Sequence, residues 1–218
     1  MFTSEIGVSE TESLTINNFF LDSGDCKIFA RRLIPKNVEI HATFIIVHGF
    51  GEHSGLFLNV ADHFIKKGYE VLMVDLKGFG YSGSGRENTT IQSMEESVVS
   101  VIEEANIGKP LILFGHSMGG LIITSISIDY PYLNISAIIV EAPFLGMPVG
   151  RELPWHKKLI IKYFGNNFQT FVLNSMINIT AIAKNSHHIR RMVDDCLVYP
   201  FLNLPLIQSM IFSIQKVH

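Results

Sequence analysis

The feature that most constrains this chain is the hexapeptide Gly115-His116-Ser117-Met118-Gly119-Gly120, which stands between two apolar runs. The run before it, Leu111–Phe114, has the length of a buried strand, and the run after it, Leu121–Ile123, opens a stretch that suits a helix. Strand and helix must therefore meet in a sharp turn with Ser117 at its apex. The glycines fit this interpretation, because such a turn brings two backbones close together and strains the apical residue.

Short apolar segments alternate with helical segments along the first two thirds of the chain. This order is typical of a parallel sheet covered by helices on both faces, so we predict an α/β fold. Near the start, Asp22-Ser23-Gly24-Asp25 separates two strands as in a hairpin. The expected strands are Leu14–Leu21, Cys26–Leu33, Thr43–Val47, Glu70–Asp75, Leu111–Phe114 and Ala137–Glu141, and the expected helices are Phe57–Lys67, Ile91–Asn106 and Met118–Asp129.

The pattern changes after Pro143. No further short β-branched run is recognisable, so we predict a core of residues 1–145 followed by a helical cap of residues 146–218. The end of the cap is almost uncharged, but Pro200 and Pro205 oppose an unbroken membrane-spanning helix there. The helical runs expected in the cap are Leu159–Phe164, Phe168–Ile182, His187–Asp195 and Leu206–Ile214.

Composition excludes several classes of function. A net charge of −3 offers no basic surface for nucleic acid, and two cysteines make neither a disulfide framework nor a metal motif. Residues 1–13 lack the basic and apolar regions of a signal peptide. We therefore expect a protein of the cytoplasm or of a membrane surface, with no metal or organic cofactor.

Two further motifs follow predicted strands. The first is His48-Gly49-Phe50-Gly51-Glu52-His53-Ser54-Gly55, and the second is Asp75-Leu76-Lys77-Gly78-Phe79-Gly80-Tyr81-Ser82. The second contains a dinucleotide-type G-x-G-x-x-G pattern, but Ser84–Asn88 after it are loop-like where a helix should begin, so we reject a dinucleotide site. We expect Asp75 to shape its loop rather than to ionise for catalysis.

Together the three motifs resemble the monoacylglycerol lipase branch of the α/β-hydrolases, also described as serine aminopeptidase S33-like. The resemblance runs from about Leu14 to Glu141 and continues more loosely through the cap. It implies an α/β-hydrolase fold and a serine esterase that cleaves lipid-like carboxylic esters under an apolar lid. Ser117 matches the nucleophile, and Phe50 and Met118 match the residues whose backbone N–H groups form the oxyanion hole. His116 directly precedes the nucleophile and is not the histidine that acts as the base in such enzymes.

The acid and the histidine that follow the serine in such enzymes are not recognisable. Asp129 lies at the far end of its helix, roughly 18 Å from the start at 1.5 Å per residue. Glu141 ends the strand that follows the Ser117 turn and its helix, but it has no histidine to orient. The remaining candidates are His156, which has no clear partner, the C-terminal His218, and His187, His188, Asp194 and Asp195, for which a solvated helix face is expected.

The predicted strand Ala137–Val140 suggests why the acid and the histidine are not recognisable. It is apolar on both faces, as a central strand should be, yet no predicted strand follows it to cover its edge. We therefore hypothesise that the chain is the N-terminal three quarters of a longer hydrolase whose last strands and helix are missing.

Three functions remain open from the sequence. The chain is part of an ester hydrolase, or a catalytically incomplete pseudoenzyme that binds lipid or a protein partner, or a fragment without function. Apolar residues in the cap suit an acyl substrate or a membrane surface, and equally suit ordinary helix packing. They are Leu197, Phe201, Leu204, Leu206, Ile207, Ile211 and Phe212.

Overall fold

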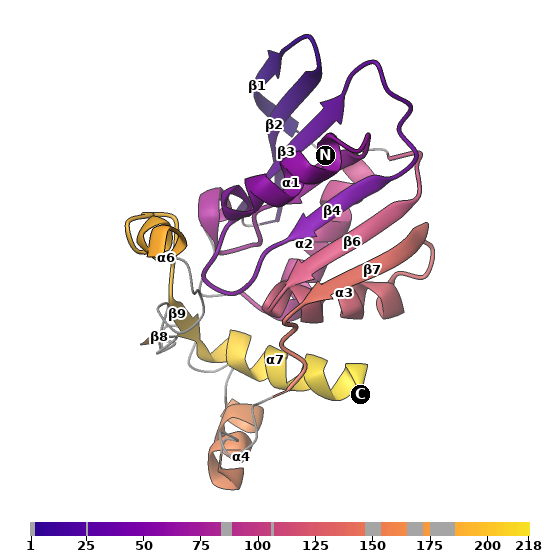
Figure 1. Cartoon of the computed structure of the whole chain (residues 1–218). Coiled ribbons are helices and arrows are strands. Elements are labelled where there is room, and N and C mark those ends of the chain that lie inside the picture. The colour runs from indigo at the N-terminus through magenta and orange to yellow at the C-terminus, as the bar shows by residue number, and fades with distance from the viewer. Residues whose placement is uncertain are drawn as a thin grey trace.

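A seven-stranded mixed sheet forms the centre of the computed structural model, which describes residues 3–24, 26–83, 89–105, 107–146, 154–164, 172–174 and 186–218 (Figure 1). The strand order is β1-β2-β3-β5-β4-β6-β7. The first three strands are antiparallel, and β5, β4, β6 and β7 run parallel to one another. The strands are β1 (Thr3–Glu10), β2 (Leu14–Ser23), β3 (Cys26–Pro35), β4 (Thr43–Val47), β5 (Glu70–Val74), β6 (Leu111–His116) and β7 (Ile135–Glu141).

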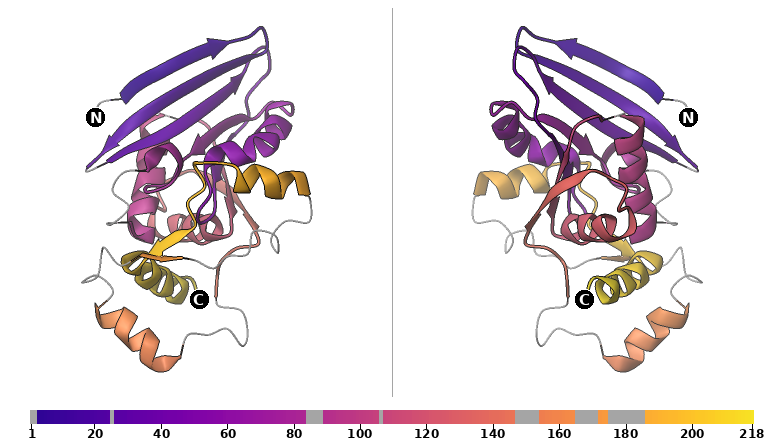
Figure 2. Two further views of the ribbon diagram at one scale, coloured as in Figure 1. Left: turned by 90° about the vertical axis from the view of Figure 1, so that its left-hand side faces the viewer. Right: turned by 90° about the vertical axis from the view of Figure 1, so that its right-hand side faces the viewer.

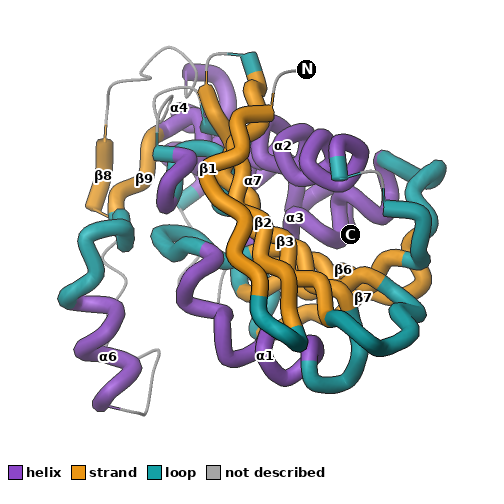
Figure 3. Tube along the Cα trace, turned by 90° about the horizontal axis from the view of Figure 1, so that it is seen from above, coloured by secondary structure: helices purple, strands orange, loops and turns teal. Residues whose placement is uncertain are grey.

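Helices cover both faces of this sheet (Figures 2 and 3). One face packs against α1 (Leu58–Ile65), and the other packs against α2 (Ile91–Glu104) and α3 (Met118–Asp129), on which α7 (Leu204–Val217) lies in turn. Alternate residues of the central strands serve the two layers: in β4, Phe44 and Ile46 face α1, while Ile45 and Val47 face the other helices. This explains why these strands are apolar throughout.

The predicted α/β order is confirmed, with two errors. The polar segment Thr3–Glu10 was not predicted as a strand, yet it pairs with β2 at the sheet edge. The helix expected over Phe168–Ile182 is wrong at β8 (Val172–Asn174), which pairs with β9 (Phe201–Asn203), and the rest of that range lies outside the described residues. These three-residue strands are set by a partner about thirty positions away, which no local periodicity reveals.

The C-terminal helix α7 packs on the helices of the core. Leu206 is almost fully buried in the same cluster as the α2 and α3 side chains, and the backbone N–H of Ile91 donates to Ser209 Oγ at 2.9 Å. Of the apolar residues in the predicted cap, Leu206 thus has an ordinary packing role. The smaller helices α4 (Trp155–Phe164) and α6 (Ser186–Val193) lie further from the sheet (Figure 1).

The outer strand β7 confirms the expected hydrophobic edge. Among the described strands it pairs only with β6, and Ile138, Ile139 and Val140 are 41–42% exposed. No helix within the described ranges is both long and apolar enough to cross a membrane.

Candidate active site

Ser117 occupies the turn between β6 and α3 in a strained conformation, with φ 50° and ψ −116°. Such angles are rare for a residue with a side chain and persist only where neighbouring structure enforces them. Here the Ser117 N–H donates to the Glu141 carbonyl at 2.9 Å, and the Ser117 carbonyl accepts from Gly120 and Phe144 at 3.0 and 2.9 Å. The predicted sharp turn with serine at its apex is confirmed.

The glycines around Ser117 are required by space. A Cβ on Gly115 would collide with the backbone of Gly119, and one on Gly119 would collide with the Val47 carbonyl oxygen. On Gly120 a Cβ would lie 2.7 Å from Cβ of Pro143. Strand β4, strand β6 and helix α3 therefore approach one another as closely as backbones can.

The loop after β4 passes over this turn. A Cβ on Gly49 would be 3.1 Å from Cβ of Ser117. Gly49 to Glu52 form a tight turn, in which the Glu52 N–H donates to the Gly49 carbonyl at 3.3 Å and Gly51 has a φ of +77°. A positive φ at this third position is typical of a type II turn and favours glycine.

Two backbone N–H groups border the serine without an acceptor. Phe50 lies in the turn just described. Met118 is the first residue of α3, so its N–H has no carbonyl within the helix to bond to. Within the described part of the chain, neither N–H donates a hydrogen bond. The Phe50 ring packs edge-on against Phe79, with ring centroids 5.5 Å apart, which fixes this residue from the side.

Carboxylates surround His116, the neighbour of Ser117. Its Nε2 lies 3.6 Å from Oε1 of Glu52 and its Nδ1 lies 3.4 Å from Oε2 of Glu141. Glu52 also accepts from the Gly49 N–H at 2.7 Å, so it ties the loop over the turn to His116. Burial raises the pKa of Glu52.

His48 is completely buried and joins two loops. Its Nδ1–H donates to the Gly49 carbonyl at 2.8 Å, and its Nε2 accepts from the Leu76 N–H at 3.0 Å. Burial lowers the pKa of His48 to about 4, since the charged ring would be desolvated. The neutral ring with one donor and one acceptor nitrogen is therefore the form that the fold holds.

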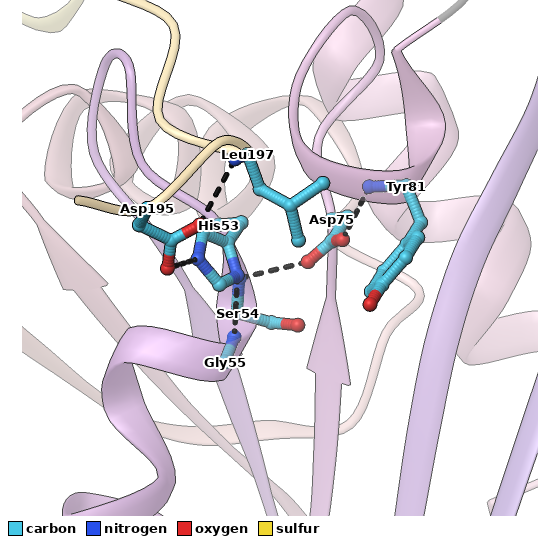
Figure 4. A network of polar contacts seen from close by, with 7 residues as sticks. All are labelled: His53, Ser54, Gly55, Asp75, Tyr81, Asp195 and Leu197. Carbon is cyan, nitrogen blue, oxygen red and sulfur yellow. Dashed lines mark hydrogen bonds and ion pairs between the residues drawn. The ribbon is translucent and has the colours of Figure 1, made fainter. Parts of the chain in front are cut away.

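Asp75 shapes its loop, as predicted (Figure 4). It is fully buried, and its carboxylate accepts from the Ser54 N–H at 2.7 Å and the Tyr81 N–H at 2.9 Å. A Cβ on Gly80 would collide with this carboxylate, which accounts for one glycine of the rejected dinucleotide pattern. Among the described residues, the next α-helix after that pattern begins at Ile91.

His53 and Asp195 form a pair that the sequence did not reveal (Figure 4). Nε2 of His53 lies 2.9 Å from Oδ2 of Asp195, and the side chains are 8% and 21% exposed. The expectation that Asp195 belongs to a solvated helix face is thus wrong, because it lies just beyond the end of α6 and turns back to the core. The two residues are 142 positions apart, too far for any motif to connect them.

The other sequence candidates for acid and base lie elsewhere. Asp129 pairs with Lys216 of α7, and His218 Nε2 lies 2.8 Å from the Leu145 carbonyl oxygen. His156 and Asp194 are exposed, and the side chains of His187 and His188 lie outside the described part. Glu141 faces His116. Among the described residues, none forms a hydrogen bond with Oγ of Ser117.

Known proteins are similar to this chain in sequence and in fold. The family model of the serine aminopeptidase S33 matches residues 38–218. The chain is 30% identical over 115 residues to the monoglyceride lipase of Saccharomyces cerevisiae, covering 49% of this chain and 37% of that enzyme. A soluble variant of a yeast monoglyceride lipase, solved with a substrate analog, superposes with a TM-score of 0.76 at 18% identity over 95% of this chain and 69% of that one. The monoacylglycerol lipase of Paleococcus ferrophilus gives 0.74 at 23% identity over 88% and 71%.

The sheet, its helices and the strained serine between β6 and α3 define an α/β-hydrolase. Since the family model covers most of the chain, this protein belongs to the serine aminopeptidase S33 family, and its expected likeness to monoacylglycerol lipases is confirmed. The family is one of lipase- and esterase-type hydrolases. The chain spans little more than a third of the length of its yeast relative.

Proposed function

We propose that this chain carries the nucleophile and the oxyanion hole of a monoacylglycerol lipase-like serine hydrolase, which cleaves carboxylic esters of lipid-like substrates. The observation that carries the proposal is the strained Ser117 next to the loop of Gly49 and Phe50, together with the N–H groups of Phe50 and Met118, which donate no hydrogen bond among the described residues. Strain at a residue with this surrounding is typical of a catalytic nucleophile.

The reaction would proceed in two steps. A general base takes the proton from Oγ of Ser117 while the oxygen attacks the ester carbonyl carbon, and the N–H groups of Phe50 and Met118 stabilise the resulting oxyanion. The ester bond then breaks, the alcohol leaves with the proton, and an acyl-enzyme remains on Ser117. Water attacks this acyl group by the same route and releases the fatty acid.

The base is proposed to come from polypeptide that continues the sheet beside β7. Two observations support this proposal: the described residues give Ser117 Oγ no hydrogen-bond partner, and the apolar edge of β7 is bare. A strand added there would cover part of Ile138, Ile139 and Val140, and loops at the carboxyl end of that strand would emerge beside Ser117.

A lipid-like substrate is supported by the yeast relative and by apolar surface on the predicted cap. On α4, Trp155, Leu159 and Tyr163 follow one another at intervals of four residues and are 75%, 49% and 64% exposed. Such a stripe on one helix face suits the interface of a membrane, where lipid esters reside.

The decisive experiment captures the native protein with a serine-reactive phosphonate and measures the intact mass of the labelled chain. Label on a chain heavier than 24.5 kDa, lost in Ser117→Ala, supports the nucleophile and the added segment. Label at 24.5 kDa supports the nucleophile but overturns the added segment, and leaves Glu141 and the cap histidines as sources of the base.

A second candidate function is lipid or protein binding without catalysis, favoured by the lack of a hydrogen-bond partner for Ser117 Oγ among the described residues. In that case the native chain takes no label, although its peptides are found at the expected mass. Lipid binding would then be unchanged in Ser117→Ala.

A further inference from the structure

The segment Asp195–Pro200, which we call the strap, crosses the loop that carries Phe50. It follows α6 and leads into β9. Two separate contacts fasten it: Asp195 bonds to His53, and the Tyr199 N–H donates to the Gly51 carbonyl at 2.9 Å. The strap is so close that a Cβ on Gly51 would lie 3.2 Å from the Tyr199 carbonyl oxygen.

These contacts fall on both sides of one peptide turn. Gly51 directly follows Phe50, and His53 comes two residues later. The turn's own closing bond, from the Glu52 N–H to the Gly49 carbonyl, is long at 3.3 Å and contributes little by itself. Besides the Phe50–Phe79 contact and the bond from the Gly49 N–H to Glu52, the direction of the Phe50 N–H therefore depends on what holds Gly51 and His53 in place.

The His53–Asp195 contact is directional. Nδ1 of His53 accepts from the Gly55 N–H at 3.2 Å, so the proton of the neutral ring is on Nε2 and donates to Asp195 (Figure 4). Asp195 in turn accepts from the Leu197 N–H at 2.9 Å, which bends the strap toward the loop. On its other side His53 is enclosed, because a Cβ on Gly80 would lie 2.8 Å from Cβ of His53.

We propose that His53 and Asp195 are positioning residues for the oxyanion hole: their hydrogen bond clamps the strap onto the turn and thereby aims the N–H of Phe50 at the reacting carbonyl. This inference rests on the function proposed above. It also gives the cap a part in catalysis, because the strap continues from α6, so that a cap segment and the oxyanion donor are placed together.

Kinetics of the intact protein, expressed from its complete coding sequence, test this role with a short-chain ester that needs little of the cap. His53→Ala and Asp195→Ala should each lower kcat about 10- to 100-fold with little change in KM, somewhat less than the loss of a whole oxyanion donor. The double variant should lose no more than the worse single one, because both remove the same clamp. Asp194→Ala, the exposed neighbour, should match the wild type.

Amide hydrogen exchange gives a readout that does not require activity. In Asp195→Ala, peptides covering residues 48–55 should exchange faster while those of β4 and β6 remain protected. Unchanged exchange in the loop, or additive losses in kcat, would overturn the clamp. A wild-type protein that neither hydrolyses esters nor takes the phosphonate refutes the proposed function, and the exchange data then decide whether the strap holds the loop.

Discussion

The turn at Ser117, which follows β6, is closely packed, whereas the neighbouring strand β7 is largely exposed. Around Ser117, glycines allow three backbones to come into contact. Buried side chains such as His48 and Asp75 accept hydrogen bonds from backbone N–H groups of the neighbouring loops. One strand further along, Ile139 and its neighbours are exposed on an unpaired edge. The contrast with the opposite edge is instructive, since β1 is polar and carries a register shift between Glu5 and Gly7, as natural edges do. Among the described strands, the outer strand β1 thus has features that protect a sheet edge, and the outer strand β7 lacks them.

The largest effect is expected from adding a side chain to the closely packed backbone around Ser117. Gly119→Ala places a methyl group against the Val47 carbonyl oxygen, and neither backbone can withdraw. We expect a loss of 3 kcal/mol or more in the free energy of unfolding, above the common range of about 1 to 3 for overpacking. Urea denaturation measures it. Gly108→Ala is the matched control, because its Cβ would meet nothing within 4 Å, and equal losses in both would contradict the close packing.

Acid should weaken the same region through His48. The pKa of His48 is about 4 in the folded protein, whereas an unfolded histidine takes up its proton near pH 6.5. The unfolded chain thus binds more protons between these values, so stability is full above pH 6.5 and falls as the pH drops toward 4. The slope approaches 1.4 kcal/mol per pH unit, with a total of about 3 kcal/mol.

The difference between the wild type and His48→Gln isolates this contribution, because the raised pKa of Glu52 acts in the opposite direction and is common to both proteins. His63→Gln, on the exposed side of α1, controls for the substitution itself. A difference curve that is flat between pH 4 and 6.5 would show that His48 is not held neutral.

A charge on β7 sharpens the comparison of the two edges. If polypeptide covers β7 in the intact protein, Ile139→Lys should destabilise that protein by about 2 kcal/mol, the scale for burying one large aliphatic side chain. Val8→Lys on β1, where Val8 is 50% exposed, should change stability by less than about 0.5 kcal/mol. Thermal unfolding of both variants decides the matter, and equal stability would mean that β7 stays exposed.

The smallest effect concerns α4, whose apolar stripe is exposed like β7 but is not part of a sheet. Replacing both Trp155 and Tyr163 by Ala should weaken binding to lipid vesicles roughly five- to tenfold, since each contributes modest apolar area. Vesicle co-sedimentation measures the change. Tyr81→Ala, exposed on the core, is the control, and equal binding of both variants would remove α4 from the membrane contact.

The chemistry-bearing turns were predictable because each depends on local steric rules. The strained turn at Ser117 and the contact of Asp75 with Tyr81 involve residues within a few positions of one another, although Gly119 and Asp75 also meet Val47 and Ser54 from distant parts of the chain. Sequence reasoning failed where a distant partner decides. The partner of His53 is Asp195, which lies 142 positions further along the chain, in the predicted cap. The segment Val172–Asn174 forms a strand because it pairs with β9. The polar strand β1 was missed for a related reason, since an edge strand needs no apolar face.

The backbone of Ser117 also has a consequence for how this protein tolerates mutation. A non-glycine residue at φ 50° and ψ −116° stores roughly 1 to 3 kcal/mol of strain, which glycine would relieve at the same position. Selection for thermal resistance alone would therefore favour loss of the serine. A library screened only for folding should accumulate glycine at position 117, so that the most heat-resistant descendants of this chain would lack the proposed nucleophile.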